Sequence, residues 1–480
     1  PPPNRRSLRQ ADFVGNRVIL KPRWIDIQRE LALSLSALAN HLRGLGYSEE
    51  ASNYLLESIE LLEKAIEADP QQVDLKLQLS IRLNYLGEVY WILGQSQSTK
   101  DCFERALNIR QALVDAEPQR VDLKHRLAMS FSELGVWTRG IGQGEKSRHY
   151  FEKALKLRKT LVKREPQLVN LKRYLTAPMR SLSNRAAATG RDQEAYSYLK
   201  ESLAIIQELY ESEPNIRDIK SILAEDFAMM ARLTQLVDRN NEEAHSYFDR
   251  SLKLRQSVAE AEPQRMISRG KLADILKEFG KFYAETGQLD ESTQLLEECI
   301  AICRMLLERQ PKRTDWQQGL ASSLRELGHA EHQINHQNTA RVYFEESVAL
   351  LNTLEALEPL RIVNRYELAQ TFNRLGELER EEKQCEAARH CFQEAVSRLD
   401  ALLALDPPRA DFRLDLADAC WNLHQLAETD ANRLAWLERM RGTLQPLQDM
   451  GMQRPRLARL WNQLSTALAR PAEDSRSQSA

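Results

Sequence analysis

Ten of the chain's 17 prolines recur at a fixed interval, and this spacing limits the possible folds more than any other feature. A step of 48 residues, with one extra residue inserted midway, separates Pro22, Pro70, Pro118, Pro166, Pro214, Pro263, Pro311, Pro359, Pro407 and Pro455. A constant period of this length indicates that one structural unit is copied about nine times. Such an array grows by stacking similar units, so the pattern disfavours a globular enzyme with a single core.

The composition favours helices throughout. Leu, Ala, Glu, Arg and Gln dominate, glycine is sparse, and no segment alternates apolar and polar residues as a strand would. A net charge of −2 disfavours nucleic acid as a partner, and no apolar run is long enough for a membrane span. Six cysteines without CxxC spacing favour free thiols in a reducing, cytoplasmic setting.

The unit that begins at Pro70 shows how one copy is built. Asp74 precedes a helical apolar pattern and is the predicted N-cap, as are Asp26, Asp122, Asp218, Asp315 and Asp411 at the same offset. This first helix should end near Gly94, and a second apolar pattern continues to Glu117. Each unit is therefore predicted to hold two antiparallel helices of roughly 18–21 residues, each about 30 Å long.

Several residues of the unit resemble the tetratricopeptide repeat. The match rests on the Leu86-Gly87 pair in the first helix, then Phe103 and Ala106 in the second, then Pro118. The resemblance implies an all-α fold, a right-handed α-solenoid of about nine antiparallel helix pairs. The unit departs from the usual length of about 34 residues, which predicts longer helices. This long variety resembles arrays in large bacterial signalling proteins, where they are joined to kinase, NTPase or protease domains.

The period also predicts the domain organisation. Residues 22–430 form the array, and residues 1–21 are an N-terminal arm or the end of an upstream domain. Residues 431–470 contain a degenerate last repeat and capping helices, in which Trp461, Leu464 and Leu468 cover the last core. Residues 471–480 are predicted to be a disordered tail. The repeats are expected to start near residues 22, 70, 118, 166, 214, 263, 311, 359 and 407.

Two segments suggest chemistry at first sight. The sequence from Gly140 to Ser147 is glycine-rich, but Glu145 stands where a phosphate-binding loop needs glycine, directly before the lysine. His329, His332 and His336 share one predicted helical face, yet no second set of metal ligands accompanies them. No catalytic motif is present, so we expect no enzymatic activity, no metal and no cofactor.

The resemblance to tetratricopeptide repeats implies a concave groove lined by the first helix of each unit. Its binding positions lie three residues before the unit's glycine and one residue after it. In this chain they include Arg180, Asn184, Arg232, Lys277, Lys281, Arg325 and His329, together with Asn84 and Asn373. Units four to seven would thus form a basic stretch, suited to an acidic segment of a protein or peptide. Alternatively, Glu225 and Asp274 on the same wall neutralise these cations.

These features favour a protein–protein interaction scaffold, or the regulatory or sensing arm of a larger signalling protein, that binds a partner in its concave groove. One alternative is a non-catalytic fragment or subunit of a multidomain signalling enzyme. Another is a structural module that self-associates through its end units.

Overall fold

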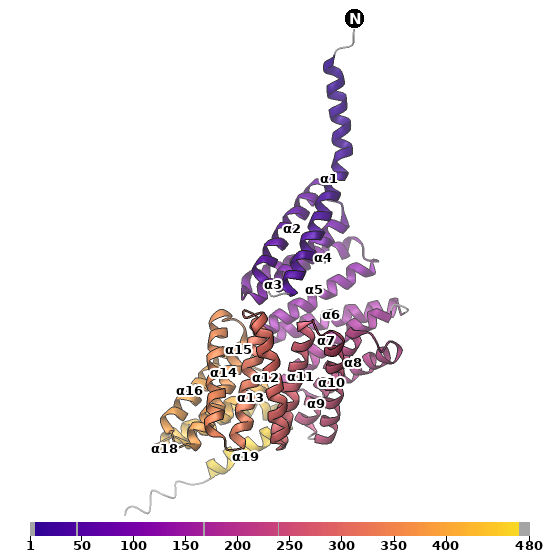
Figure 1. Ribbon diagram of the computed structural model, residues 1–480. Coiled ribbons are helices and arrows are strands. Elements are labelled where there is room, and N and C mark those ends of the chain that lie inside the picture. Colours follow the sequence, from indigo (N-terminus) through magenta and orange to yellow (C-terminus); the bar gives the residue numbers. More distant parts are fainter. Residues whose placement is uncertain (1–4, 45–46, 167–168, 239, 470–480) are drawn as a thin grey trace, which may run out of the picture. The chain divides into compact units, whose positions relative to one another are not determined.

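The structure is a computed structural model that describes residues 5–44, 47–166, 169–238 and 240–469, with the backbone alone for residues 5–23, 44, 169 and 170. These residues form nineteen helices and no strand (Figure 1), which confirms the predicted all-α class. The tail predicted for residues 471–480 lies outside the described ranges. None of the described helices contains an apolar stretch sufficient to cross a membrane.

Eighteen of the helices form nine pairs, each made of a helix A and a helix B. The pairs are α1 (Arg5–Gly44) with α2 (Ser48–Ala68), α3 (Val73–Ile92) with α4 (Ser96–Ala116), α5 (Val121–Gly140) with α6 (Gly144–Arg164), α7 (Val169–Ala188) with α8 (Asp192–Ser212), α9 (Arg217–Val237) with α10 (Asn241–Ala261), α11 (Met266–Thr286) with α12 (Leu289–Arg309), α13 (Thr314–Gln333) with α14 (Gln337–Leu357), α15 (Ile362–Glu381) with α16 (Cys385–Leu405), and α17 (Ala410–Gln425) with α18 (Asp430–Asp449). A single helix, α19 (Pro455–Ala469), follows the last pair. From α2 to α16, every helix has 20 or 21 residues, in agreement with the predicted length.

The chain divides into two compact units. The first unit comprises residues 1–137 and 156–161, and the second comprises residues 138–155 and 162–480. The second unit therefore holds the fourth to ninth helix pairs and helix α19.

The first helix extends beyond the predicted start of the array. Helix α1 begins at Arg5 and continues without a break to Gly44. The segment expected to form an N-terminal arm is therefore, from Arg5 onward, the beginning of the first helix A. The boundary predicted between residues 21 and 22 does not coincide with a helix end.

The predicted N-cap role of the recurring aspartate is wrong. Asp74 lies in the first turn of α3, and the residue before that helix makes no side-chain cap. In later repeats an arginine two residues upstream holds the aspartate: Arg120 donates to Asp122 at 2.6 Å and Arg313 donates to Asp315 at 2.6 Å. The Arg120 hydrogen bond lowers the pKa of Asp122 below its usual value. A carboxylate in the first turn still complements the positive end of the helix dipole.

Glycine in helix A allows the side chain of helix B to pack against the backbone. A Cβ atom added to Gly376 would lie 2.8 Å from Cε1 of Phe392, and the same contact with an aromatic ring occurs at Gly328. At Gly280 the neighbour is Leu296, whose Cγ would lie 2.8 Å from the added Cβ. Distances this short exclude any side chain unless the packed neighbour moves.

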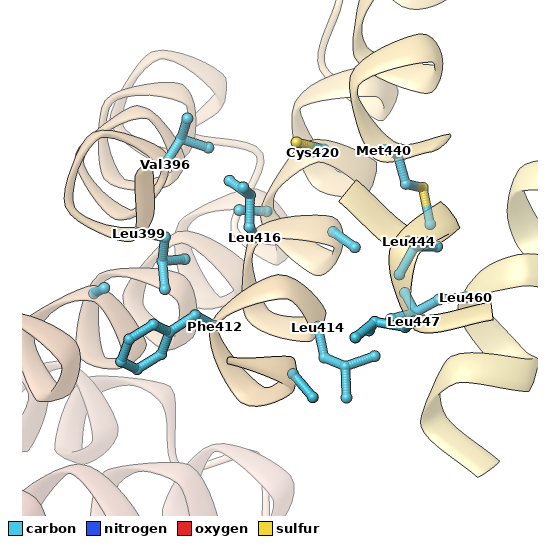
Figure 2. Packing of buried hydrophobic residues seen from close by; sticks show 14 of the residues in the cluster. Val396, Leu399, Phe412, Leu414, Leu416, Cys420, Met440, Leu444, Leu447 and Leu460 are labelled. Carbon is cyan, nitrogen blue, oxygen red and sulfur yellow. The ribbon is translucent and has the colours of Figure 1, made fainter. Parts of the chain in front are cut away.

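The apolar stripe on a helix A that follows another pair is buried against helix B of that pair, as α3 shows. Leu75, Leu79 and Leu86 of α3 share one buried cluster with Leu55 and Ile59 of α2. Figure 2 shows the last such core, where α16, α17, α18 and α19 bring together Val396, Leu399, Phe412, Leu416, Met440, Leu444, Leu447 and Leu460.

Helix α19 covers the end of this last core. Leu464 is buried, and Trp461 and Leu468 are half-buried against the same cluster. Helix α19 thus supplies the polar-faced terminal cover that a stacked array needs.

Two ion pairs join distant repeats within the second unit, one of them fully buried and the other partly buried. The guanidinium of Arg185, at the end of α7, donates to both carboxylate oxygens of Asp406 at 2.5 and 2.9 Å. Arg454, just before α19, donates to Asp192 at 2.6 and 3.2 Å. The partners are 221 and 262 residues apart in sequence. The fourth pair therefore contacts the eighth and ninth, so the second unit curves back on itself.

The loops beside this contact need glycine. Gly142 and Gly190 have φ angles of +82° and +77°, which L side chains rarely adopt. An added Cβ would also lie 3.1 Å from Leu405 at the first position and 2.0 Å from Met452 at the second. The two turns thus combine a left-handed backbone with a close approach to later repeats.

Substitution of two helical glycines should have opposite effects on stability. Gly376→Ala should lower the free energy of unfolding of the second unit by about 1–3 kcal/mol, because the methyl group collides with Phe392. Gly442→Ala in α18 should raise it by up to about 1 kcal/mol, because nothing lies within 4 Å and alanine favours a helix. Urea titrations followed by circular dichroism measure both values. A stabilising Gly376→Ala would contradict the close-packing account.

Breaking the long-range ion pair should destabilise the second unit strongly. Arg185→Ala leaves the Asp406 carboxylate buried without its bidentate partner, so we expect a loss of about 3–5 kcal/mol in urea unfolding. Arg185→Leu combined with Asp406→Leu should recover most of this loss, because no charge remains buried. Arg304→Ala is the matched control, since its pair with Glu346 is exposed and should contribute less than about 1 kcal/mol. Equal effects of Arg185→Ala and Arg304→Ala would show that the long-range contact contributes little.

Candidate functional site

A cavity of about 690 Å³ lies in the second unit on the inner side of helices α11, α13, α15 and α17, with α19 along one wall. We call it the inner cavity. Its charged lining comprises Lys281, Arg325, Arg374, Arg380, Arg456 and Arg459 as cations and Glu285, Glu326, Glu377, Asp415 and Asp418 as carboxylates. The amides Gln370, Asn373, Asn422, Gln425 and Gln463 and the indole of Trp421 complete the polar wall.

Ion pairs across neighbouring helices fix the charged side chains. Arg325 is buried and donates to Glu326 at 2.6 Å and also to Glu367 of α15. Arg456 of α19 donates to Asp415 at 2.5 Å and to Asp418. Burial alone would raise the pKa of Glu326, but Lys281 and Arg325 outweigh it and lower that pKa below its usual range. The inner cavity therefore presents fixed charges of both signs.

Two amide oxygens of the inner cavity are buried without a hydrogen-bond donor, Oδ1 of Asn373 and Oε1 of Gln463. The Nδ2 atom of Asn373 makes one long contact, 3.4 Å to the backbone oxygen of Asp415. An unpaired buried acceptor costs free energy until a donor reaches it. These positions therefore suit a ligand that supplies N–H groups, as a peptide backbone does.

The structure brings some of the predicted groove residues together. Lys281, Arg325 and Asn373 line the inner cavity. Arg232 and Lys277 line a smaller cavity of about 190 Å³ in the same unit. The remaining predicted residues do not line the inner cavity: Arg180 and Asn184 on α7, His329 on α13, and Asn84 on α3, which belongs to the first unit.

Carboxylates neutralise the stretch predicted to be basic. Arg180 lies 3.3 Å from Asp226 and 3.6 Å from Glu225, so the second of these partners is one that the sequence suggested. Arg232 lies 3.3 Å from Glu278, and Lys277 lies 3.9 Å from the same carboxylate. The other predicted neutralising residue, Asp274, pairs with a lysine at position 271 at 3.0 Å. The wall is thus charge-balanced where the sequence suggested an excess of cations.

The histidines do not form the single face predicted from their spacing. Helix α13 ends at Gln333, and His336 is the residue that precedes helix α14. His332 contacts Glu381 at 2.8 Å, and His336 contacts Glu331 at 2.7 Å. Among the described residues, no group of three His, Cys, Asp or Glu side chains has the geometry of a metal site.

The glycine-rich segment 140–147 falls where the repeat period places it, across the turn between α5 and α6. A phosphate-binding loop instead connects a strand to a helix. The described segment thus lacks the surroundings that such a loop requires.

A second cavity of about 720 Å³ adjoins the inner cavity. The two share Lys281, Glu285, Gln370, Pro455 and Arg456, and the second extends to Arg232 on α9 and Arg454. Arg454 is also one of the residues that join distant repeats, through its bond to Asp192. The two cavities therefore share part of their lining, and the second, which also has apolar walls such as Phe248 and Phe282, is bordered by the contact that joins distant repeats.

Several residues of the inner cavity were not among the predicted groove positions. Trp421 lies 48 residues after Asn373, and Gln425 lies 48 residues after position 377. The repeat period could therefore have predicted both of them. Arg456 and Arg459 lie on α19, which begins at Pro455, the last of the recurring prolines, and takes the place of helix A in a further, incomplete repeat.

His329 should make the second unit sensitive to mild acid. Burial, with a smaller effect of Arg374, lowers the pKa of His329 to about 3, whereas the usual value is 6.5. Between these two pH values the unfolded chain binds more protons at this histidine than the folded chain does. The contribution of His329 to the free energy of unfolding is therefore complete above pH 6.5 and is lost as the pH falls. At pH 5 the loss should be about 2 kcal/mol. Urea titrations at pH 7 and pH 5 measure the fall in the free energy of unfolding between these pH values. The fall should be smaller by this amount in His329→Gln than in the wild type. An equal fall in the two proteins would contradict the assignment to His329.

The sequence and the structure were compared with known proteins. No curated protein matches the sequence. Similar solved structures include BtubC of P. vanneervenii, with 17% identity over 55% of this chain and 94% of that chain and a TM-score of 0.39. A Rap protein complexed with Competence and Sporulation Factor has 12% identity over 83% and 100% of the two chains and a TM-score of 0.44. Another similar structure is a Signal Transduction ATPase with Numerous Domains from Pyrococcus horikoshii, which has a tetratricopeptide repeat sensor. It is 15% identical over 83% of this chain and 53% of that chain, with a TM-score of 0.41.

The family comparison agrees with the repeat pattern. The model of the tetratricopeptide repeat matches residues 127–167 and 272–311, which fall in the third and sixth helix pairs. Both segments span the end of a helix A and the following helix B, where the glycine and its packing partner lie. The chain therefore contains tetratricopeptide repeats.

Proposed function

We propose that this protein is a non-catalytic interaction module that binds a peptide segment of a partner protein in the inner cavity. The observation that carries the proposal is a cavity of about 690 Å³ whose walls come from four successive helices A and from α19. Its buried amide oxygens on Asn373 and Gln463 lack donors, and backbone N–H groups of a peptide would satisfy them.

The charges of the inner cavity indicate the side chains that the peptide carries. Arg380 donates to the amide oxygen of Gln425 and pairs with no carboxylate in the described part of the chain, and Arg459 is more than half exposed beside Asp418. These two guanidinium groups can each bind a carboxylate of the peptide. The partner segment therefore contains acidic residues, as the groove positions predicted from the sequence suggested. Fixed carboxylates such as Glu377 and Asp415 disfavour the phosphates of a nucleic acid.

This role fits a cytoplasmic scaffold or the sensing arm of a signalling protein, in which the array recognises a partner and another domain acts. A non-catalytic subunit of a signalling enzyme would use the same cavity. A purely structural module would leave the inner cavity without a ligand. Peptide binding in this cavity therefore distinguishes an interaction module from a structural one.

Selection from a displayed library of random 12-residue peptides tests the proposal. Peptides enriched on the wild-type chain should contain Asp or Glu and should bind it in fluorescence anisotropy. Asn373→Ala, Arg380→Ala and Arg459→Ala together should weaken that binding roughly 30- to 100-fold, because two to three hydrogen bonds are lost. Circular dichroism should show unchanged helicity.

Arg304→Ala is the matched control, because this arginine is an exposed ion-pairing residue on α12, outside the inner cavity. It should bind the selected peptides as the wild type does. Equal affinity of the triple variant and the wild type, or no peptide enriched above an unrelated helical protein, would refute binding in the inner cavity.

A further inference from the structure

Helix α1 exposes large apolar side chains along one face. Trp24, Ile27, Leu31 and Leu38 are 40%, 59%, 44% and 42% exposed. Their spacings of three, four and seven residues place them on one side of the helix. We call these four residues the α1 stripe. Apolar residues gathered on one side mark an interaction surface more often than single exposed ones do.

The repeat period shows what such a stripe does elsewhere in the chain. Ile27, Leu31 and Leu38 lie 48 residues before Leu75, Leu79 and Leu86 of α3. Those three leucines are only 0%, 5% and 2% exposed. They are buried in one cluster with residues 55, 59 and 62 of α2, the helix B of the preceding pair.

The next repeat follows the same rule. Leu123 and Leu127 of α5 lie a further 48 residues along the chain and are 1% and 4% exposed. They pack against Leu113 and Val114 of α4, again the preceding helix B. The α1 stripe therefore has the register of a surface that a helix B covers. Within the described part of the chain α1 is the first helix, and no helix B precedes it.

A second copy of this chain cannot supply that helix by stacking end to end. The last helix B, α18, contributes Met440, Leu444 and Leu447 to a cluster that also contains Leu457 and Leu460 of α19 (Figure 2). Helix α19 thus already occupies the face that the next helix A would take. The described array has one covered end and one end whose apolar stripe is free.

We propose that the α1 stripe binds an amphipathic helix of a partner protein, which takes the place of a preceding helix B. The interface continues the nearest-neighbour packing already present between α2 and α3. The partner helix carries large apolar residues at the spacing of Leu55, Ile59 and Leu62 in α2 and polar residues on its other side. This site lies in the first unit and is distinct from the inner cavity of the second.

A fluorescent synthetic peptide with the sequence of residues 48–68 is the probe, because that helix covers the equivalent stripe of the second repeat. Anisotropy with the full chain should show saturable binding. Ile27→Glu with Leu31→Glu should weaken the binding at least tenfold, while circular dichroism shows unchanged helicity. Val342→Glu, an exposed apolar position on α14, is the matched control and should bind as the wild type does.

Three results would overturn the proposal. The peptide could bind no better than a version with Leu55→Ser and Leu62→Ser. It could bind the wild type and the Ile27→Glu, Leu31→Glu variant equally. Finally, light scattering could show a wild-type dimer that the same two substitutions convert to a monomer, in which case a second copy covers the stripe through its own α1.

Discussion

Burial of the apolar stripe of each helix A against the preceding helix B is the interaction on which the array depends. A single helix pair cannot cover this stripe, so every repeat relies on its neighbour. This dependence explains the constant step of 48 residues, which places Leu75, Leu123 and their equivalents on the same buried face of helix A in successive repeats. The two ends of the array then differ: α19 covers one, and Ile27 and Leu31 are exposed at the other.

Much of this architecture could be predicted from the sequence because it is local and repeated. Helix lengths, the positions of the turns and the fit of an aromatic ring against Gly376 all follow from the period. The predicted N-cap failed because an aspartate at the cap and one in the first turn differ by two residues, within the uncertainty of a sequence pattern. Arg120, two residues before Asp122, is the residue in the sequence that could have predicted the observed ion pair with this aspartate.

The candidate site was less predictable, since its electrostatics depend on contacts between repeats. The inward positions of Lys281, Arg325 and Asn373 followed from the resemblance to the family. The carboxylates that balance the cations, such as Glu367, occupy neighbouring helices at positions the motif does not specify. Helix α19 adds Arg456 from the incomplete repeat that begins at Pro455, at a position where the motif places no groove residue.

The pairing of Arg185 with Asp406 has a thermodynamic consequence for the second unit. In a linear array each repeat senses only its neighbours, and unfolding can begin at either end and spread. A contact between the fourth and eighth pairs turns the second unit from an open chain into a loop of coupled repeats. Fraying at one end then also removes an interaction from repeats far along the sequence.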